Sequence, residues 1–69
     1  METMGQRLKR LRKELNVTLK EVAIDTGISL TLLCRYEKDW HKANLKNMAK
    51  LSNYYGVSID YIYRGSSNG

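Results

Sequence analysis

The sequence predicts an all-α domain built from five short helices. Apolar residues recur at spacings of three and four along several stretches, which is the period of an amphipathic helix. Ser, Thr or Asn precedes most of these stretches and Gly follows most of them, as is usual at helix ends. The few β-branched residues are dispersed and never alternate with polar ones, so no sheet competes with the helices.

The chain of 69 residues suits one small domain. We expect this domain to occupy residues 1–65 and residues 66–69, SSNG, to form a disordered C-terminal tail. The first helix is predicted over residues 4–15, and its inner face carries Met4, Leu8, Leu11 and Leu15. The other face is basic, which is typical either of a solvated helix face or of a phosphate-binding one.

The central stretch, residues 18–37, predicts two short helices joined by a tight turn. Thr18 and Glu21 have the spacing of a capping box, and Gly27 suits the left-handed position that ends the first of these helices. Ser29 is a good N-cap for the second, so only Ile28 separates the two ends. Helices joined so closely must cross steeply, which is the helix-turn-helix arrangement.

The second of these helices has an inner face with Leu33, Tyr36 and Glu37. Its outward face carries Thr31, Cys34, Arg35 and Lys38. After a polar loop over residues 39–43, Asn44 caps a fourth helix whose inward residues are Leu45, Met48, Leu51 and Tyr55. Ser58 begins a fifth helix that ends at Gly65.

The residue inventory argues against several classes of function. One cysteine and one histidine cannot form a disulfide or a zinc site, and neither a glycine-rich phosphate loop nor usefully paired carboxylates occur. We therefore expect no enzyme, no metal, no cofactor and no small-molecule ligand. With neither a membrane-length apolar run nor a signal-peptide pattern, we expect a cytoplasmic protein and no membrane partner.

The net charge of +5 indicates a polyanionic partner. Five of the twelve basic residues fall within seven positions, and further positive charge follows the central stretch at Lys38 and Lys42. The clustered residues are Arg7, Lys9, Arg10, Arg12 and Lys13.

The joint order of four motifs resembles the helix-turn-helix domain of phage Cro proteins and lambda-type repressors, also called the xenobiotic-response-element family. The motifs are GQRLKRLRKE, VTLKEVAIDTGIS, LCRYE and NLKNMAKLSNYYGVSIDYIYRG, and they cover residues 5–65 without a gap. The resemblance implies a compact five-helix lambda-repressor-like fold. It also implies a sequence-specific regulator of transcription that binds double-stranded DNA, most simply a phage or bacterial Cro-like repressor.

In this family the third helix enters the DNA major groove. Carried over by position, Leu30, Thr31 and Arg35 would face base edges, and the fork of Arg35 suits the O6 and N7 atoms of guanine. Residues expected at the DNA backbone are Arg7, Arg10, Ser29, Cys34, Lys38 and Lys42. The resemblance further implies a partly buried ion pair between Arg12 and Glu37.

Several positions depart from the family pattern. Leu19 stands where Gln is usual, Leu30 and Leu32 replace polar residues, and Asp39 replaces Gly. The three leucines would form an apolar patch beside the DNA face, and such patches often bind proteins. An alternative function is therefore an antirepressor or modulator that binds a partner repressor protein through this patch.

Small proteins of this kind usually bind DNA as two-fold dimers. We therefore expect a homodimer on DNA. Tyrosines gather near the C-terminal end of the sequence, where Tyr54 and Tyr61 are candidates for the dimer surface. The alternative is that they are ordinary surface residues.

Overall fold

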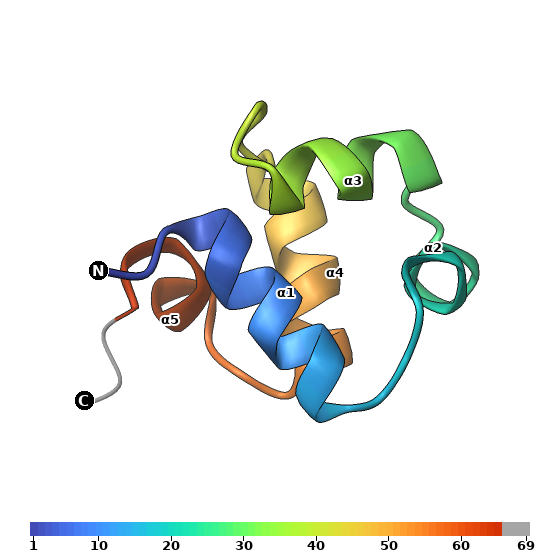
Figure 1. Ribbon diagram of the computed structural model, residues 1–69, viewed down its shortest axis with the longest axis horizontal. Helices are drawn as coiled ribbons and strands as arrows, with labels where there is room; N and C mark the ends of the chain where they lie inside the picture. The colour runs from blue at the N-terminus through green and yellow to red at the C-terminus, as the bar shows by residue number, and fades with distance from the viewer. Residues whose placement is uncertain (66–69) are drawn as a thin grey trace.

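The computed structural model describes residues 1–65 and folds them into five helices, which confirms the predicted fold class (Figure 1). The helices are α1 (Met4–Glu14), α2 (Leu19–Thr26), α3 (Leu30–Glu37), α4 (Leu45–Tyr55) and α5 (Ile59–Arg64). Residues 1–65 contain no strand. Over the same range, no helix has both the length and the apolar character needed to cross a membrane. The tail expected over residues 66–69 lies outside the described residues.

Each helix begins with a side chain that accepts a hydrogen bond from an amide in its first turn. At α2 the predicted capping box is present: the Thr18 hydroxyl accepts from the Glu21 amide at 3.1 Å, and the Glu21 carboxylate accepts from the Thr18 amide at 2.8 Å. A second capping box, between Thr3 and Gln6, starts α1 and was not predicted. The remaining caps are Ser29, Asn44 and Ser58.

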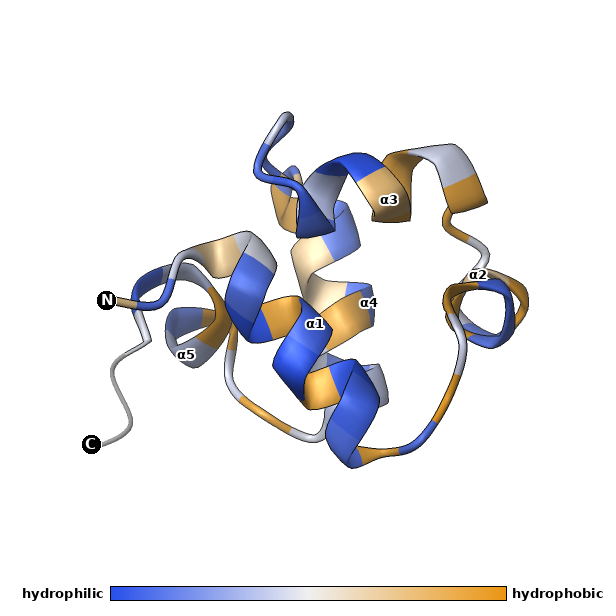
Figure 2. Ribbon diagram, viewed as in Figure 1, coloured by the Kyte–Doolittle hydropathy of each residue, from blue (hydrophilic) through white to orange (hydrophobic). Residues whose placement is uncertain are grey.

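The core receives apolar side chains from all five helices. Val22, Leu51 and Ile62 are its most buried members. Figure 2 shows that much of the surface of α1 in this view is hydrophilic, as expected for an amphipathic helix. The other members of the core cluster are Leu8, Ile28, Leu33, Tyr36, Ala43 and Met48.

Two leucines that we predicted to face the core are exposed. The exposed fraction is 72% for Leu45 and 49% for Leu15. Leu45 is the first residue of α4, and Leu15 is the cap residue that follows α1. Both lie at helix ends. The helical period identifies the inner side of a helix, but not how far along its axis the neighbouring helices extend.

The turn between α2 and α3 is held by Thr26 and Ile28. Gly27 has a φ of 76°, the left-handed conformation that was predicted. The Thr26 hydroxyl donates to the Val22 carbonyl at 2.7 Å and accepts from the Ile28 amide at 3.2 Å. The Ile28 side chain is buried in the core. This turn directs α3 across α2 and leaves one side of α3 facing outward.

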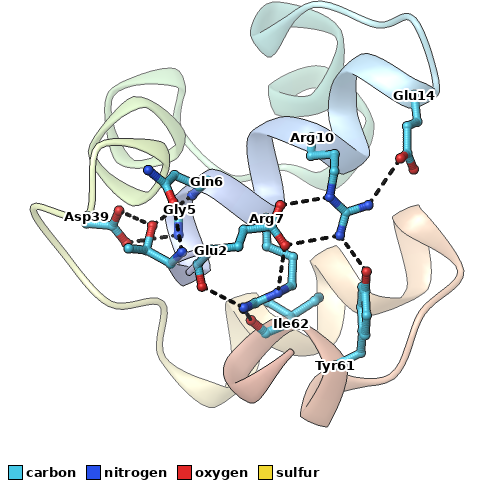
Figure 3. A network of polar contacts seen from close by, with 10 residues as sticks. Glu2, Gly5, Gln6, Arg7, Arg10, Glu14, Asp39, Tyr61 and Ile62 are labelled. Atoms are coloured by element: carbon cyan, nitrogen blue, oxygen red, sulfur yellow. Dashed lines mark hydrogen bonds and ion pairs between the residues drawn. The ribbon is translucent and has the colours of Figure 1, made fainter. Parts of the chain in front are cut away.

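The C-terminal end of α3 is joined to the start of α1 by Asp39. The residue has a φ of 62°, and the Trp40 amide donates to the Arg35 carbonyl at 2.9 Å. This is the Schellman pattern of helix termination, here with Asp in the position that glycine usually takes. The Asp39 carboxylate accepts from the Gly5 amide at 2.9 Å (Figure 3). Asp39 therefore ends α3 and also accepts a hydrogen bond from the first turn of α1, beside the Thr3 cap.

Gly5 lets α1 approach α3 to backbone contact. A Cβ atom at this position would lie 2.4 Å from the Tyr36 carbonyl oxygen and 2.7 Å from that of Glu37. Only glycine fits such an approach without a shift of the backbone. The Thr3 hydroxyl donates a further hydrogen bond to Asp39. The Gly that the family usually has after α3 is thus replaced by an Asp that uses the space beside Gly5.

The expected ion pair between Arg12 and Glu37 is present in the structure. Arg12 donates to the two Glu37 carboxylate oxygens at 2.8 Å and 3.1 Å, and a third bond of 3.2 Å reaches the Val17 carbonyl. The side chains are only 14% and 9% exposed. The hydrogen bond to Glu37 raises the pKa of Arg12. This paired geometry is strong and directional, so it fixes the last residue of α3 against α1.

We expect Asp39→Ala to destabilise the fold by about 1–2 kcal/mol, because it removes the acceptor of the Gly5 amide and leaves a left-handed residue with a Cβ. Asp39→Gly should cost about 1 kcal/mol or less, because glycine relieves the backbone while the hydrogen bond from Gly5 is still lost. Urea denaturation of the two variants measures both effects.

Asn16 provides the control for this comparison. It also has a left-handed φ, 59°, at the end of α1. Asn16→Gly should leave the free energy of unfolding unchanged or raise it slightly, since the substitution affects only the strain of the left-handed backbone. If Asp39→Gly proved as harmful as Asp39→Ala, backbone strain at Asp39 would be negligible.

Candidate nucleic-acid interface

The outward side of α3 is the candidate interface. Thr31, Arg35 and Lys38 are exposed, and Cys34 is half-buried between them and the body of the domain. Leu33 and Tyr36 on the opposite side are buried, as predicted. The Ser29 hydroxyl accepts from the Leu32 amide at 3.1 Å, which fixes the N-terminal end of α3. The helix therefore presents one polar, cationic side on a rigid support.

The cations on and after α3 are free to bind an anion. Arg35, Lys38 and Lys42 are exposed, and none forms an ion pair within residues 1–65. Lys20 is similarly exposed in the first turn of α2, although the sequence-based prediction of backbone contacts did not include it. Its place at a helix N-terminus was a usable signal, because backbone amides there favour anions.

The predicted apolar patch of Leu19, Leu30 and Leu32 is not assembled. Leu19 and Leu32 are partly buried and pack against the core cluster. Only Leu30, 47% exposed, stands on the surface. The prediction was wrong because Leu19, at the start of α2, and Leu32, on the flank of α3, both pack against the core cluster.

Arg7 does not belong to the interface. Its side chain is buried and donates to the Ile62 carbonyl at 2.7 Å and the Glu2 carbonyl at 3.0 Å (Figure 3). Ile62 lies in the last turn of α5, where carbonyl groups have no partner within the helix. The predicted contact of Arg7 with DNA phosphate is therefore wrong, because the guanidinium ties α5 to α1 from inside the fold.

Arg10 is also engaged within the chain. It pairs with Glu2 at 2.7 Å and Glu14 at 3.1 Å, and it donates to the Tyr61 hydroxyl (Figure 3). The hydrogen bond to Arg10 lowers the pKa of Glu2, so this tether of the N-terminal segment is lost only as pH falls through that lowered pKa. Phosphate would have to compete with two carboxylates for Arg10, which corrects its predicted role as a backbone contact.

The two tyrosines considered for a dimer surface are bonded within the chain. The Tyr54 hydroxyl donates to Asp25 at 3.2 Å, and its ring packs edge-on against Tyr55, with 5.1 Å between centroids. Tyr61 lies beneath the guanidinium of Arg10 at 5.9 Å. Both residues therefore have intramolecular partners that explain their positions.

A helix-turn-helix domain family model matches residues 5–67. The chain belongs to this family. A relative named HTH-type transcriptional regulator ImmR, from Bacillus subtilis (strain 168), is 38% identical over 60 residues, which are 87% of this chain and 47% of the relative. The chain spans about half the length of the curated relatives it matches.

No group of three or more His, Cys, Asp and Glu residues is placed to hold a metal within residues 1–65.

Solved structures extend the likeness to repressor domains. The P22 c2 repressor in complex with the synthetic operator 9T is 26% identical, with a TM-score of 0.91 over 96% of this chain and 100% of the other. The N-terminal DNA-binding domain of SinR from Bacillus subtilis is 28% identical, with a TM-score of 0.81 over 86% of this chain and 87% of the other. The expected lambda-repressor-like fold is confirmed.

We expect Arg7→Met to act on folding and not on DNA. The substitution leaves the Ile62 carbonyl without a donor and should cost about 2 kcal/mol, or roughly 10 °C in Tm. At temperatures where the variant is folded, its affinity for duplex DNA and the salt dependence of that affinity should match the parent. Lys42→Gln is the counterpart. It should leave the Tm unchanged and make the salt dependence of the affinity for duplex DNA shallower. A shallower salt dependence of DNA affinity for Arg7→Met would show that Arg7 does contact DNA.

Proposed function

We propose that this chain binds double-stranded DNA in a sequence-specific manner and represses transcription by occupying an operator, as a Cro-like repressor of phage or bacterial origin. The observation that supports this most is the rigid, unpaired cationic side of α3. It occurs on a fold that closely matches the P22 c2 repressor, which was solved in complex with an operator. Such a regulator acts in the cytoplasm.

In this proposal α3 enters the major groove. Arg35 lies near the C-terminal end of α3 and is exposed, so its fork can pair with O6 and N7 of guanine. Thr31 offers a hydroxyl, and the exposed Leu30 can contact a thymine methyl group. Arg35 therefore provides most of the discrimination between bases.

Contacts to the DNA backbone orient the helix without reading sequence. Ser29, Cys34, Lys38 and Lys42 serve this role in the proposal, and Lys20 joins them. The three lysines of this set form no ion pair with a carboxylate within residues 1–65, in contrast to Arg10. Removing any one lysine should weaken binding to all sequences alike.

A second copy of the chain completes the proposal. An open groove of ≈ 800 Å³ lies between α4 and α5, with the exposed Leu45 and Tyr63 on its lining together with Ile59. Its rim carries Asp60 and Arg64, which pair with each other at 2.6 Å within α5, so the rim presents no excess charge of one sign that would repel a second copy. This groove replaces Tyr54 and Tyr61 as the proposed dimer surface.

The antirepressor alternative has lost its structural basis. It required a contiguous exposed patch, and only Leu30 is exposed, while Leu19 and Leu32 are partly buried against the core cluster. A single exposed leucine needs no explanation.

Selection of bound duplexes from a random pool at fixed salt tests the function. We expect a short consensus with two-fold symmetry. Arg35→Ala should relax one base position in each half-site by about 1–3 kcal/mol of discrimination while other positions persist. Lys9→Gln, which removes an exposed charge from α1, is the control and should leave the consensus unchanged. Recovery of no consensus would contradict sequence-specific repression.

Leu45→Glu tests the dimer surface. A charge in the groove should leave the chain monomeric on the selected duplex and weaken occupancy of the full site roughly tenfold, or about 1.4 kcal/mol. Ile24→Glu is a matched control, because Ile24 is 71% exposed and Leu45 is 72% exposed. Sedimentation velocity of the complexes reports the stoichiometry. Two copies bound by the Leu45 variant with unchanged affinity would exclude the groove.

A further inference from the structure

Trp40 is the only tryptophan of the chain, and it is 67% exposed. It lies in the connection between α3 and α4, which rises past α3 at the top of Figure 1. Figure 2 shows that this connection is largely hydrophilic. The core does not use this ring, which contributes a large, rigid contact area to the surface.

The loop is held in place next to α3. The Trp40 amide donates to the Arg35 carbonyl at 2.9 Å, and the Asp39 amide donates to the Tyr36 carbonyl at 3.1 Å. The Asp39 carboxylate is bonded to α1 through the Gly5 amide. These bonds fix the backbone at Trp40, so little entropy remains to be lost there when a partner binds.

The surroundings of the ring are cationic. The Lys38 ammonium lies 4.6 Å from the centroid of the Trp40 ring, a cation–π contact. His41 and Lys42 follow and are exposed. The one carboxylate of the loop, on Asp39, is bonded to Gly5 and Thr3 and not to its cationic neighbours. The exposed side of the loop thus combines an aromatic ring, an indole N–H donor and positive charge.

The proposed binding mode brings this group to the edge of the groove. With α3 in the major groove, its eight residues span only about 12 Å. The residues directly after its C-terminal end then lie where the chain leaves the groove and passes the sugar-phosphate chain that borders it.

We propose that Trp40 and Lys38 act together as a sequence-independent clamp on the sugar-phosphate backbone of duplex DNA. This inference rests on the proposed function and deepens it. The indole N–H donates to a phosphate oxygen, the ring packs against deoxyribose, and the Lys38 ammonium neutralises a phosphate. Because the clamp continues directly from α3, it sets how far Arg35 reaches along the base edges.

Tryptophan emission from the parent chain, titrated with a random-sequence 20-bp duplex, tests the contact directly. Trp40 is the only source of this signal, so its emission should change in proportion to binding. Trp40→Ala should weaken binding to the random duplex and to the selected duplex by the same factor, about tenfold, and Trp40→Phe should fall between. Lys38→Gln should reduce the slope of log K against log salt by about one.

Lys9→Gln is the matched charge control and should leave the salt slope unchanged, and thermal melting should show that all variants fold. Unchanged emission together with full affinity of Trp40→Ala would overturn the clamp and leave the proposed function standing. A loss confined to the selected duplex would also overturn it, since Trp40 would then be reading bases. Altered self-association with unchanged DNA affinity would assign the ring to a protein contact. Failure to bind any duplex would instead refute the proposed function.

Discussion

The contact between α1 and the C-terminal end of α3 determines how the outward helix is held. Gly5 allows the two backbones to approach closely, and the Asp39 carboxylate accepts a hydrogen bond that joins their ends. About two turns further along α1, Arg12 forms an ion pair with Glu37. A buried charge pair adds little net stability compared with apolar residues of the same shape. Its value lies in direction, because a two-pronged hydrogen bond permits few orientations. The proposed reading of DNA by α3 needs a fixed helix angle, so it depends first on this contact.

Arginine is divided between two tasks in this chain. Arg7 and Arg12 are enclosed and bonded to carbonyl or carboxylate groups of other segments, whereas Arg35 is exposed and unpaired within residues 1–65. Burial without such partners would be prohibitive for a guanidinium, so the bonded arginines act as connectors between helices. The number of basic residues therefore overstates the cations available to a nucleic acid. Most of the free charge belongs to lysines.

The sequence predicted the helices, most of their caps and the turn after α2, because these depend on neighbours along the chain. The Arg12–Glu37 pair came from family resemblance. Arg7 was misassigned although a signal existed: with Met4, Leu8 and Leu11 it completes the i, i+3, i+4, i+7 stripe of a buried helix face. The predictions of an inward-facing Leu45 and of an exposed leucine patch were wrong, because packing between segments distant in sequence decides which side chains are exposed at helix ends and flanks.

The size of α3 limits what one copy can read. Eight residues present only a few outward side chains, and a single module of this kind covers about 600–1,000 Å² of protein surface on DNA. In the proposed binding mode, base contacts from Arg35 and its neighbours therefore specify only a short half-site. Two additions compensate in physically different ways: backbone contacts raise affinity for every sequence, and a second copy doubles the bases that are read. In our proposals the loop after α3 supplies the first, and the groove between α4 and α5, which begins at Lys42 and Ala43 of the same loop, supplies the second.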